Sequence, residues 1–114
     1  QFKDYNAIKL ACNTSKLWFS STDLDPNFID YVIYGNSVHQ KHGFYAGPWS
    51  AKLLGTSGIG VCISQACITG ATSLYEAAAS IEIGLNNTVY CLTADRTSSL
   101  ITFRNIFTND LVSI

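Results

Sequence analysis

The sequence predicts the α/β class, with a layered, mostly parallel sheet flanked by helices. Three observations predict it. Segments with helical periodicity alternate with short segments rich in β-branched and aromatic residues. Two of the predicted strands, at 58–66 and 88–94, are almost continuously apolar, which is typical of strands buried on both faces of a parallel sheet. The 114 residues, 47% of them hydrophobic, suffice for one compact domain with its own core.

The first half of the chain predicts a helix, a turn, a strand and a loop, in that order. Apolar residues recur at helical spacing over about 5–19, and Asp4 is placed to cap the start. The face that they define consists of Ala7, Ile8, Ala11 and Trp18. The segment 22–28 contains an Asp-Pro breaker and predicts a turn. The segment 29–35 is short, β-branched and aromatic and ends in glycine, which favours a strand before the loop at 36–48.

The second half predicts further helices and strands in alternation. A short helix is expected over about 49–54, before the first apolar strand at 58–66. After Cys67, apolar residues step by three and four positions, which indicates a helix. These residues are Ala71, Leu74, Ala78, Ile81 and Leu85. Gly84 is placed to end this helix, and the second apolar strand at 88–94 follows.

Charge and composition argue against several classes of partner. The formal net charge is −1 and there is no run of basic residues, so we expect neither nucleic acid nor an anionic membrane surface as a partner. No apolar run approaches the roughly 20 residues that span a bilayer. No signal peptide is visible at the start. A metal site is not expected, because the chain has no Cys-x-x-Cys pair and its two histidines, His39 and His42, lie in a predicted loop.

The redox compartment is judged from four cysteines, which are Cys12, Cys62, Cys67 and Cys91. Together with Asn-x-Ser/Thr triplets at Asn13 and Asn86, they would fit a secreted, disulfide-bonded domain. Three of the cysteines lie within or beside apolar runs, however, where a free cysteine behaves as a small hydrophobic residue. We therefore expect a reduced, cytoplasmic protein and keep the disulfide-bonded domain as the alternative.

Cys67 differs from the other cysteines because it lies between the predicted strand at 58–66 and the first turn of the next helix. The free N–H groups and the positive dipole end of a helix start favour the thiolate, which is the nucleophilic form. Ligands of open α/β sheets bind at the carboxyl ends of strands, where this residue would lie. Gly70 would let a substrate or another chain come close. Cys67 is therefore a candidate nucleophile, and a structural cysteine at a crowded helix start is the alternative.

Several stretches, taken in order, resemble the amino-terminal domain of the thiolase family, the acetyl-CoA acetyltransferases and 3-ketoacyl-CoA thiolases. The stretches that carry the resemblance are 24-LDPNFIDYVIYGN-36, 37-SVHQ-40, 51-AKLLG-55, 67-CITG-70 and 89-VYCLTADRTSS-99. The most specific is 67-CITG-70, which matches the family's Cys-x-Ser/Thr-Gly and precedes a helix of small residues. We therefore expect residues 1–99 to be part of a thiolase-like N-terminal domain and residues 100–114 to be an atypical tail.

The resemblance implies acyl transfer between acyl-CoA thioesters, with Cys67 as the nucleophile that holds the acyl group as a thioester. It also implies acyl-CoA and CoA as substrates, no further cofactor, and a homodimer in which the strand at 58–64 lies near the two-fold axis. The family's catalytic histidine and second cysteine belong to a carboxy-terminal half that these 114 residues do not include. Neither His39 nor His42 matches that histidine's motif, so both are expected to be solvated. The chain alone is therefore expected to show little or no turnover.

The sequence also departs from the family pattern. Ala94-Asp95-Arg96 stands in place of the family's Gly-Gly-x-Glu, which indicates a divergent subgroup. An inactive thiolase-like fragment, or a subunit whose partner supplies the second half, is therefore the alternative function. The ketoacyl synthases share the fold by resemblance, although 29-IDYVIYGN-36 fits the thiolases better.

Overall fold

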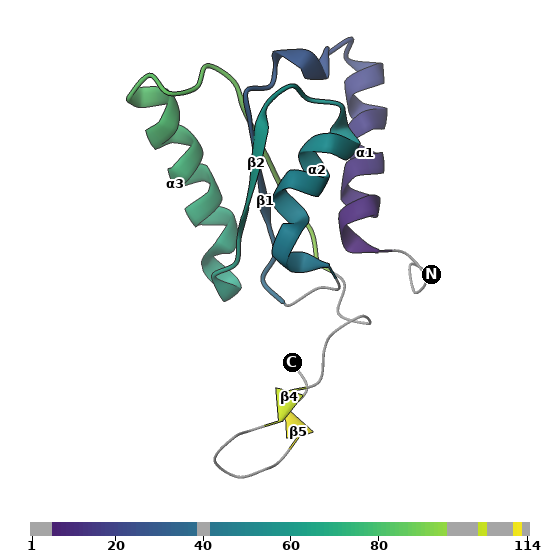
Figure 1. The fold of residues 1–114 in the computed structure, drawn as a ribbon, viewed down its shortest axis with the longest axis vertical. Coiled ribbons are helices and arrows are strands. Elements are labelled where there is room, and N and C mark those ends of the chain that lie inside the picture. Colours follow the sequence, from purple (N-terminus) through teal and green to yellow (C-terminus); the bar gives the residue numbers. More distant parts are fainter. Residues whose placement is uncertain (1–5, 39–41, 96–102, 105–110, 113–114) are drawn as a thin grey trace.

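The computed structural model describes residues 6–38, 42–95, 103–104 and 111–112, and its helices and strands alternate as the sequence predicts (Figure 1). The main elements are α1 (Ala7–Ser21), β1 (Tyr31–Gly35), α2 (Ala46–Leu54), β2 (Ile59–Ile63), α3 (Thr69–Glu82) and β3 (Val89–Thr93). Three 3-10 turns connect them, at η1 (Pro26–Phe28), η2 (Gly43–Tyr45) and η3 (Ala66–Ile68). Further along, β4 (Phe103–Arg104) and β5 (Leu111–Val112) form an antiparallel pair.

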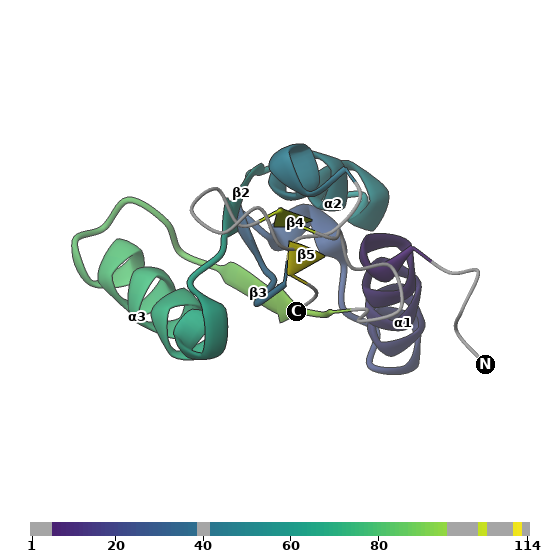
Figure 2. The same cartoon turned by 90° about the horizontal axis from the view of Figure 1, so that it is seen from below.

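The central sheet has three strands in the order β2-β1-β3. Both neighbours run parallel to β1, with Tyr31 opposite Ile59 on one side and Val89 on the other. Since the strands are parallel, their carboxyl ends lie along one edge of the sheet. Figure 2 shows α1 and α2 together on one side of the sheet and α3 on the other. The predicted layered α/β class with a parallel sheet is confirmed.

The main hydrophobic core lies between the sheet and the α1–α2 layer. Val32 and Tyr34 of β1 are fully buried there, next to Leu92 of β3. The helices contribute Ile8, Cys12 and Phe19 from α1, and Ala46, Ala51 and Leu54 from α2. Burying large aliphatic and aromatic side chains of this kind contributes on the order of 2 kcal/mol each, so this layer dominates the stability of the fold.

The helix ends follow local chemistry, with two corrections to the predicted boundaries. Asn6 caps α1, because its Oδ1 accepts a hydrogen bond from the N–H of Ile8 at 2.9 Å. The predicted cap, Asp4, lies outside the described residues. Helix α2 begins at Ala46, three residues before the predicted start, since the 3-10 turn η2 leads directly into it. Gly84 ends α3 in the left-handed conformation (φ 81°), as the sequence predicts.

The apolar face predicted for α1 is only partly correct. Ala7 and Ile8 are buried, but Trp18 is 51% exposed and Phe19 takes its place in the core. Trp18 lies nearly parallel to the ring of Tyr90, with centroids 6.5 Å apart. Trp18 therefore covers the edge of the sheet and does not fill the core.

Helix α3 packs on the sheet through small side chains. Its buried residues are Thr69, Ser73, Ala77 and Ser80. The two buried serine hydroxyls are satisfied inside the helix, since Ser73 donates to the carbonyl of Thr69 and Ser80 to that of Ala77. The apolar residues that predicted this helix lie on its outer side, and all of them are exposed: Ala71, Leu74, Ala78, Ile81 and Leu85. The helix is thus where the periodicity places it, but its larger side chains face away from the sheet.

The prediction that 58–66 is a strand buried on both faces is wrong. Strand β2 covers only Ile59–Ile63, and its residues are exposed or half-buried, with Ile59 70% exposed. The reason is its place at an edge of the sheet. The same prediction for 88–94 is also wrong, because β3 forms the opposite edge and only its Leu92 is buried. A continuous apolar run therefore marks a strand with an open edge here and not a central one.

Candidate functional site

Cys67 lies in η3, the turn that joins the carboxyl end of β2 to the start of α3. Its side chain is exposed, in contrast to Cys12, which is buried, and to Cys62 and Cys91, which are half-buried. All four thiols are free. The position agrees with the sequence-based expectation of a thiol between strand and helix.

The backbone directly before Cys67 is strained. Ala66 adopts a left-handed conformation with φ 52°, which a residue with a Cβ disfavours by roughly 1–2 kcal/mol. Thr69 offsets this strain through its hydroxyl. Its Oγ1 accepts a hydrogen bond from the N–H of Gln65 at 2.8 Å and lies 2.7 Å from the carbonyl oxygen of Ala66. The turn that carries Cys67 is thus closed around one buried hydroxyl.

Thr69 also joins this turn to the end of strand β1. Its Oγ1 lies 3.2 Å from the carbonyl oxygen of Asn36, which is 3% exposed. The Asn36 N–H donates to the carbonyl of Ile63 at the end of β2. Gly35 lets the helix come this close, because a Cβ there would lie 2.8 Å from Thr69 Cγ2. The ends of β1 and β2 and the start of α3 therefore meet at one point beside Cys67.

The carboxylate of Asp95, just after β3, lies at the same end of the sheet and bonds to the segment that follows β1. Asp95 Oδ1 accepts hydrogen bonds from the N–H groups of Ser37 at 2.8 Å and Val38 at 3.0 Å, and Oδ2 accepts from the Ser37 hydroxyl. Tyr34 donates from its hydroxyl to the carbonyl of Ala94 at 3.2 Å. Burial, and secondarily the Asp95 charge, raise the pKa of Tyr34, so this hydroxyl keeps its proton.

The start of α3 follows η3 directly, so the Thr69 N–H already donates to the carbonyl of Ala66, and open space lies beside the helix at Gly70. No side chain caps the helix and no acidic residue lies in its first turn. The first N–H groups of a helix lack intrahelical partners and favour an anion. At Gly70 an added Cβ would meet nothing within 4 Å among the described residues. The uncapped helix start thus leaves room for a substrate beside Gly70.

The other three thiols lie in environments that oppose ionisation. Burial raises the pKa of Cys12 to about 11, although the nearby Lys16 charge acts in the opposite direction. Burial also raises the pKa of Cys62 and of Cys91. The Sγ of Cys91 lies 3.6 Å from the carbonyl oxygen of Ser73 beneath α3. These positions agree with the structural roles expected for them.

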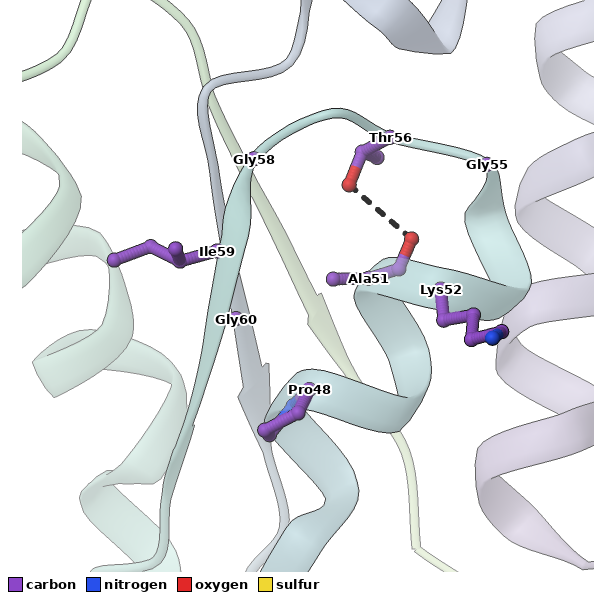
Figure 3. Close-up of a pocket in the computed structure, with 8 residues that line it drawn as sticks. All are labelled: Pro48, Ala51, Lys52, Gly55, Thr56, Gly58, Ile59 and Gly60. Atoms are coloured by element: carbon purple, nitrogen blue, oxygen red, sulfur yellow. Dashed lines mark hydrogen bonds between the residues drawn. The ribbon is translucent and has the colours of Figure 1, made fainter.

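Two cavities lie near β2, and Cys67 lines neither of them. The smaller, of about 220 Å³, lies at the carboxyl end of the strand and is lined by Asn36, Gly43, Phe44, Cys62 and Ser64. The larger, of about 620 Å³, lies between α2 and the amino-terminal half of β2 (Figure 3). Lys52 is its charged lining residue, and Thr56 donates from its hydroxyl to the carbonyl of Ala51 at 3.1 Å. Cys67 is exposed and lines neither of these two cavities among the described residues.

The structure describes one of the two histidines, and its contacts are with aromatic side chains. His39 lies outside the described residues. His42 is exposed, with a left-handed backbone (φ 64°), and its Nδ1 lies 2.6 Å from the Tyr45 hydroxyl. Within 6–38 and 42–95, no group of three or more histidine, cysteine, aspartate and glutamate side chains is placed to hold a metal ion. Among the described helices, none has the length and apolar character to cross a membrane.

Sequence reasoning found Cys67 but missed the residues that hold it. From the sequence, Thr69 is marked only by the Cys-x-Ser/Thr-Gly match, and Asn36 only as the first residue of the loop at 36–48 and the last of a stretch that resembles the thiolase family. Asp95 was noted as a departure from the family pattern, without a structural role. The signal that could have found these residues is their position in the chain. Asn36 and Asp95 come just after strands and Thr69 starts a helix, and parallel strands bring such positions together.

Comparisons with known proteins agree with this geometry. The sequence matches no protein-family model and no curated protein. Solved structures do match: the Acat5 thiolase of Ascaris suum, crystallised with coenzyme A, has a TM-score of 0.83 at 18% identity over 99% of this chain and 31% of that one. The Bacillus anthracis acetyl-CoA acetyltransferase has a TM-score of 0.75 at 19% identity over 96% of this chain and 28% of that one. The chain has a thiolase-like fold and spans less than a third of these proteins.

Proposed function

We propose that this chain supplies the nucleophile of a thiolase-type acyl transfer between acyl-CoA thioesters. The Cys67 thiolate attacks the thioester carbonyl carbon, a new C–S bond forms to Cys67, and the C–S bond to CoA breaks. CoA leaves as a thiolate and takes up a proton. The acyl group then remains on Cys67 until a second acyl-CoA carbanion or CoA accepts it.

One observation carries this proposal. The exposed thiol of Cys67 lies on the strained turn between the carboxyl end of β2 and the uncapped start of α3. The fold around it is shared with a thiolase and an acetyl-CoA acetyltransferase. Donors aimed at a developing oxyanion contribute strongly to acyl transfer, and we propose that backbone N–H groups in the first turn of α3 supply them. The coenzyme A bound to the Ascaris suum thiolase supports acyl-CoA as the substrate class, and the proposal needs no further cofactor.

The site that we propose is half of a catalytic centre. We propose that the base that activates the second substrate comes from outside this chain, because neither His39 nor His42 matches the family's catalytic histidine motif. The chain alone then stops after the first half-reaction. We place the protein in the cytoplasm, where free thiols persist, and this agrees with four unpaired cysteines.

We further propose a homodimer through the free edge of β2. Edge strands normally carry charges, prolines or bulges that prevent pairing with another chain. Strand β2 reads Ile-Gly-Val-Cys-Ile, with neither a charge nor a proline. Two copies related by a two-fold axis would pair this edge with itself.

A second candidate function is that of an inactive fragment or a subunit that needs a partner half. The outer face of α3 favours it, because Leu74, Tyr75 and Ile81 are 66%, 76% and 46% exposed. Contiguous apolar surface of this kind marks a contact with more protein. Both candidates require a covering partner, and they differ in whether Cys67 accepts an acyl group.

The first half-reaction can be tested on the purified chain with acetyl-CoA. We expect release of one equivalent of CoA per chain, measured by chromatography, followed by no further release. Cys67→Ser should release none, whereas Cys91→Ser should behave as the parent. Continued turnover of acetoacetyl-CoA by the chain alone would show that the site is complete. Equal CoA release by the parent and Cys67→Ser would refute the role of Cys67.

A further inference from the structure

The geometry points to Asp95 as a positioning residue that fixes the Cys67 turn from the far side of the sheet. This inference deepens the proposed function and rests on it. Asp95 follows β3, whereas Cys67 follows β2, and β1 lies between the two strands. A connection between them must therefore pass through the segment that follows β1, which is residues 36–38.

The first step is the bond between Asp95 and that segment. The carboxylate accepts hydrogen bonds from two successive N–H groups, of Ser37 and Val38, and from the Ser37 hydroxyl. Hydrogen bonds to a charged acceptor are roughly twice as strong as neutral ones. A further bond ties the strands themselves, since the Ala94 N–H donates to the carbonyl of Gly35 at 3.1 Å. The backbone after β1 is thereby held in one position.

The second step leads from that segment to Cys67. The carbonyl of Asn36, next to Ser37, lies 3.2 Å from Thr69 Oγ1. The same hydroxyl accepts from the N–H of Gln65 and lies within bonding distance of the carbonyl of Ala66. These contacts hold Ala66 in its left-handed conformation and so set the direction of the next side chain, Cys67. Asp95 acts on Cys67 through Asn36 and Thr69, without touching it.

The chain contains a comparable carboxylate, Asp30, at the opposite end of the sheet, where the strands begin. Asp30 precedes β1, and its Oδ2 accepts hydrogen bonds from the N–H groups of Asn87 at 2.7 Å and Thr88 at 3.2 Å, just before β3. The two carboxylates make the same kind of bond between neighbouring loops. Asp30 lies at the amino-terminal ends of the strands and Asp95 at the carboxyl ends. Asp30 thus serves as a control for loss of a loop bond without effect on Cys67.

The first measurement is amide hydrogen exchange on the parent, Asp95→Ala, Asp95→Asn and Asp30→Ala chains. In Asp95→Ala we expect the Ser37, Val38 and Gln65 amides to exchange about tenfold faster or more, because charge-assisted bonds are lost. Asp95→Asn keeps an acceptor oxygen and should restore most of the protection. Asp30→Ala should speed the Asn87 and Thr88 amides and leave Gln65 unchanged. Unchanged exchange of Gln65 in Asp95→Ala, or the same change in Asp30→Ala, would overturn the inference.

The second measurement is the rate of Cys67 acetylation by acetyl-CoA in the same variants. We expect Asp95→Ala to be slower by about tenfold or more, since displacing a reacting group by about 1 Å costs on the order of 100-fold. Asp95→Asn should be nearly as fast as the parent, and so should Asp30→Ala. Equal rates in the parent and Asp95→Ala would contradict the inference. Absence of acetylation in the parent would refute the proposed function alone, because the exchange of Gln65 still decides whether Asp95 holds the turn.

Discussion

At the residue scale, the site depends on Ala66, whose backbone is held in a conformation that alanine disfavours. A left-handed alanine is disfavoured, and here the Thr69 hydroxyl bonds on both sides of it. Strained residues persist where their surroundings hold them, often beside reactive groups. Cys67, the nucleophile that we propose, follows this strained residue directly.

Replacing Ala66 with glycine should relieve the strain. We expect Ala66→Gly to raise the free energy of unfolding by up to about 1 kcal/mol, because glycine adopts positive φ at no steric cost. The measurement is urea denaturation. Ala78→Gly, on the exposed side of α3, is the control and should lower it by about 1 kcal/mol. Equal losses in the two variants would show that Ala66 is unstrained.

The buried thiol of Cys12 should make stability depend on pH. Its pKa is raised from 9.0 to about 11, so the folded chain holds this proton more tightly than the unfolded chain. The resulting stabilisation is fully present below pH 9.0 and is lost as the pH rises toward about 11. Denaturation series between these values should show a shallower decline for Cys12→Ala than for the parent. Identical slopes would refute burial as the cause.

At the element scale, the site exists because α3 lies close to the end of β1. Gly35 permits this contact, since a Cβ there would meet Thr69 Cγ2 and Thr93 Cγ2 at 2.8 Å each. Thr69 is 3% exposed and hydrogen-bonded, so it has little freedom to move away. The helix start, and Cys67 with it, is therefore located by this glycine.

Adding a methyl group at Gly35 should disturb both stability and site. We expect Gly35→Ala to lower the free energy of unfolding by about 1–3 kcal/mol, the usual cost of overpacking. Gly70→Ala is the matched control, because its Cβ meets nothing within 4 Å, and it should be neutral or stabilising. A Gly35→Ala variant as stable as Gly70→Ala would show that the helix does not pack this closely.

Local signals predicted the elements well but not their orientation. The spacing of Leu74, Ala78 and Ile81 identified α3, and Gly84 identified its end. Which side of the helix meets the sheet depends on the partner surface, where Gly35 lies against Thr69 and Ser73. Cys91 also contacts Ser73 there. Periodicity carries no information about that surface. For the same reason the apolar run of β2 could not show that the strand lies at an edge.

Of the candidate site, only Cys67, the nucleophile that we propose, was predictable from the sequence. Cys67 has a recognisable position between strand and helix. Asp95 and Asn36 are distant from it in sequence and contribute through hydrogen bonds that depend on strand order. The order β2-β1-β3 brings them together, and no local pattern encodes that order.

At the scale of the whole molecule, the described residues leave the edge of β2 and the outer face of α3 without a partner, and β3 likewise has no strand on its outer edge. Ile59 is 70% exposed on the first and Ile83 is 71% exposed at the end of the second. The proposed homodimer uses β2. Ile59→Lys should therefore shift the chain from dimer to monomer in sedimentation velocity, since charges on edge strands block pairing.

Ile83→Lys is the matched control, because the two isoleucines are almost equally exposed. It should leave the dimer intact. A monomeric parent chain, or a dimer lost in Ile83→Lys and kept in Ile59→Lys, would contradict pairing through β2.

The central claim, that Cys67 is an acyl acceptor, is tested most directly by peptide mass mapping after incubation with acetyl-CoA. The four thiols of one chain compete within the same sample, so reagent and folding are identical for all of them. We predict one acetyl group per chain, on the peptide that contains Cys67, removable by hydroxylamine as a thioester is. An acetyl group spread over the four cysteines, or absent from Cys67 while iodoacetamide labels it, would contradict the claim.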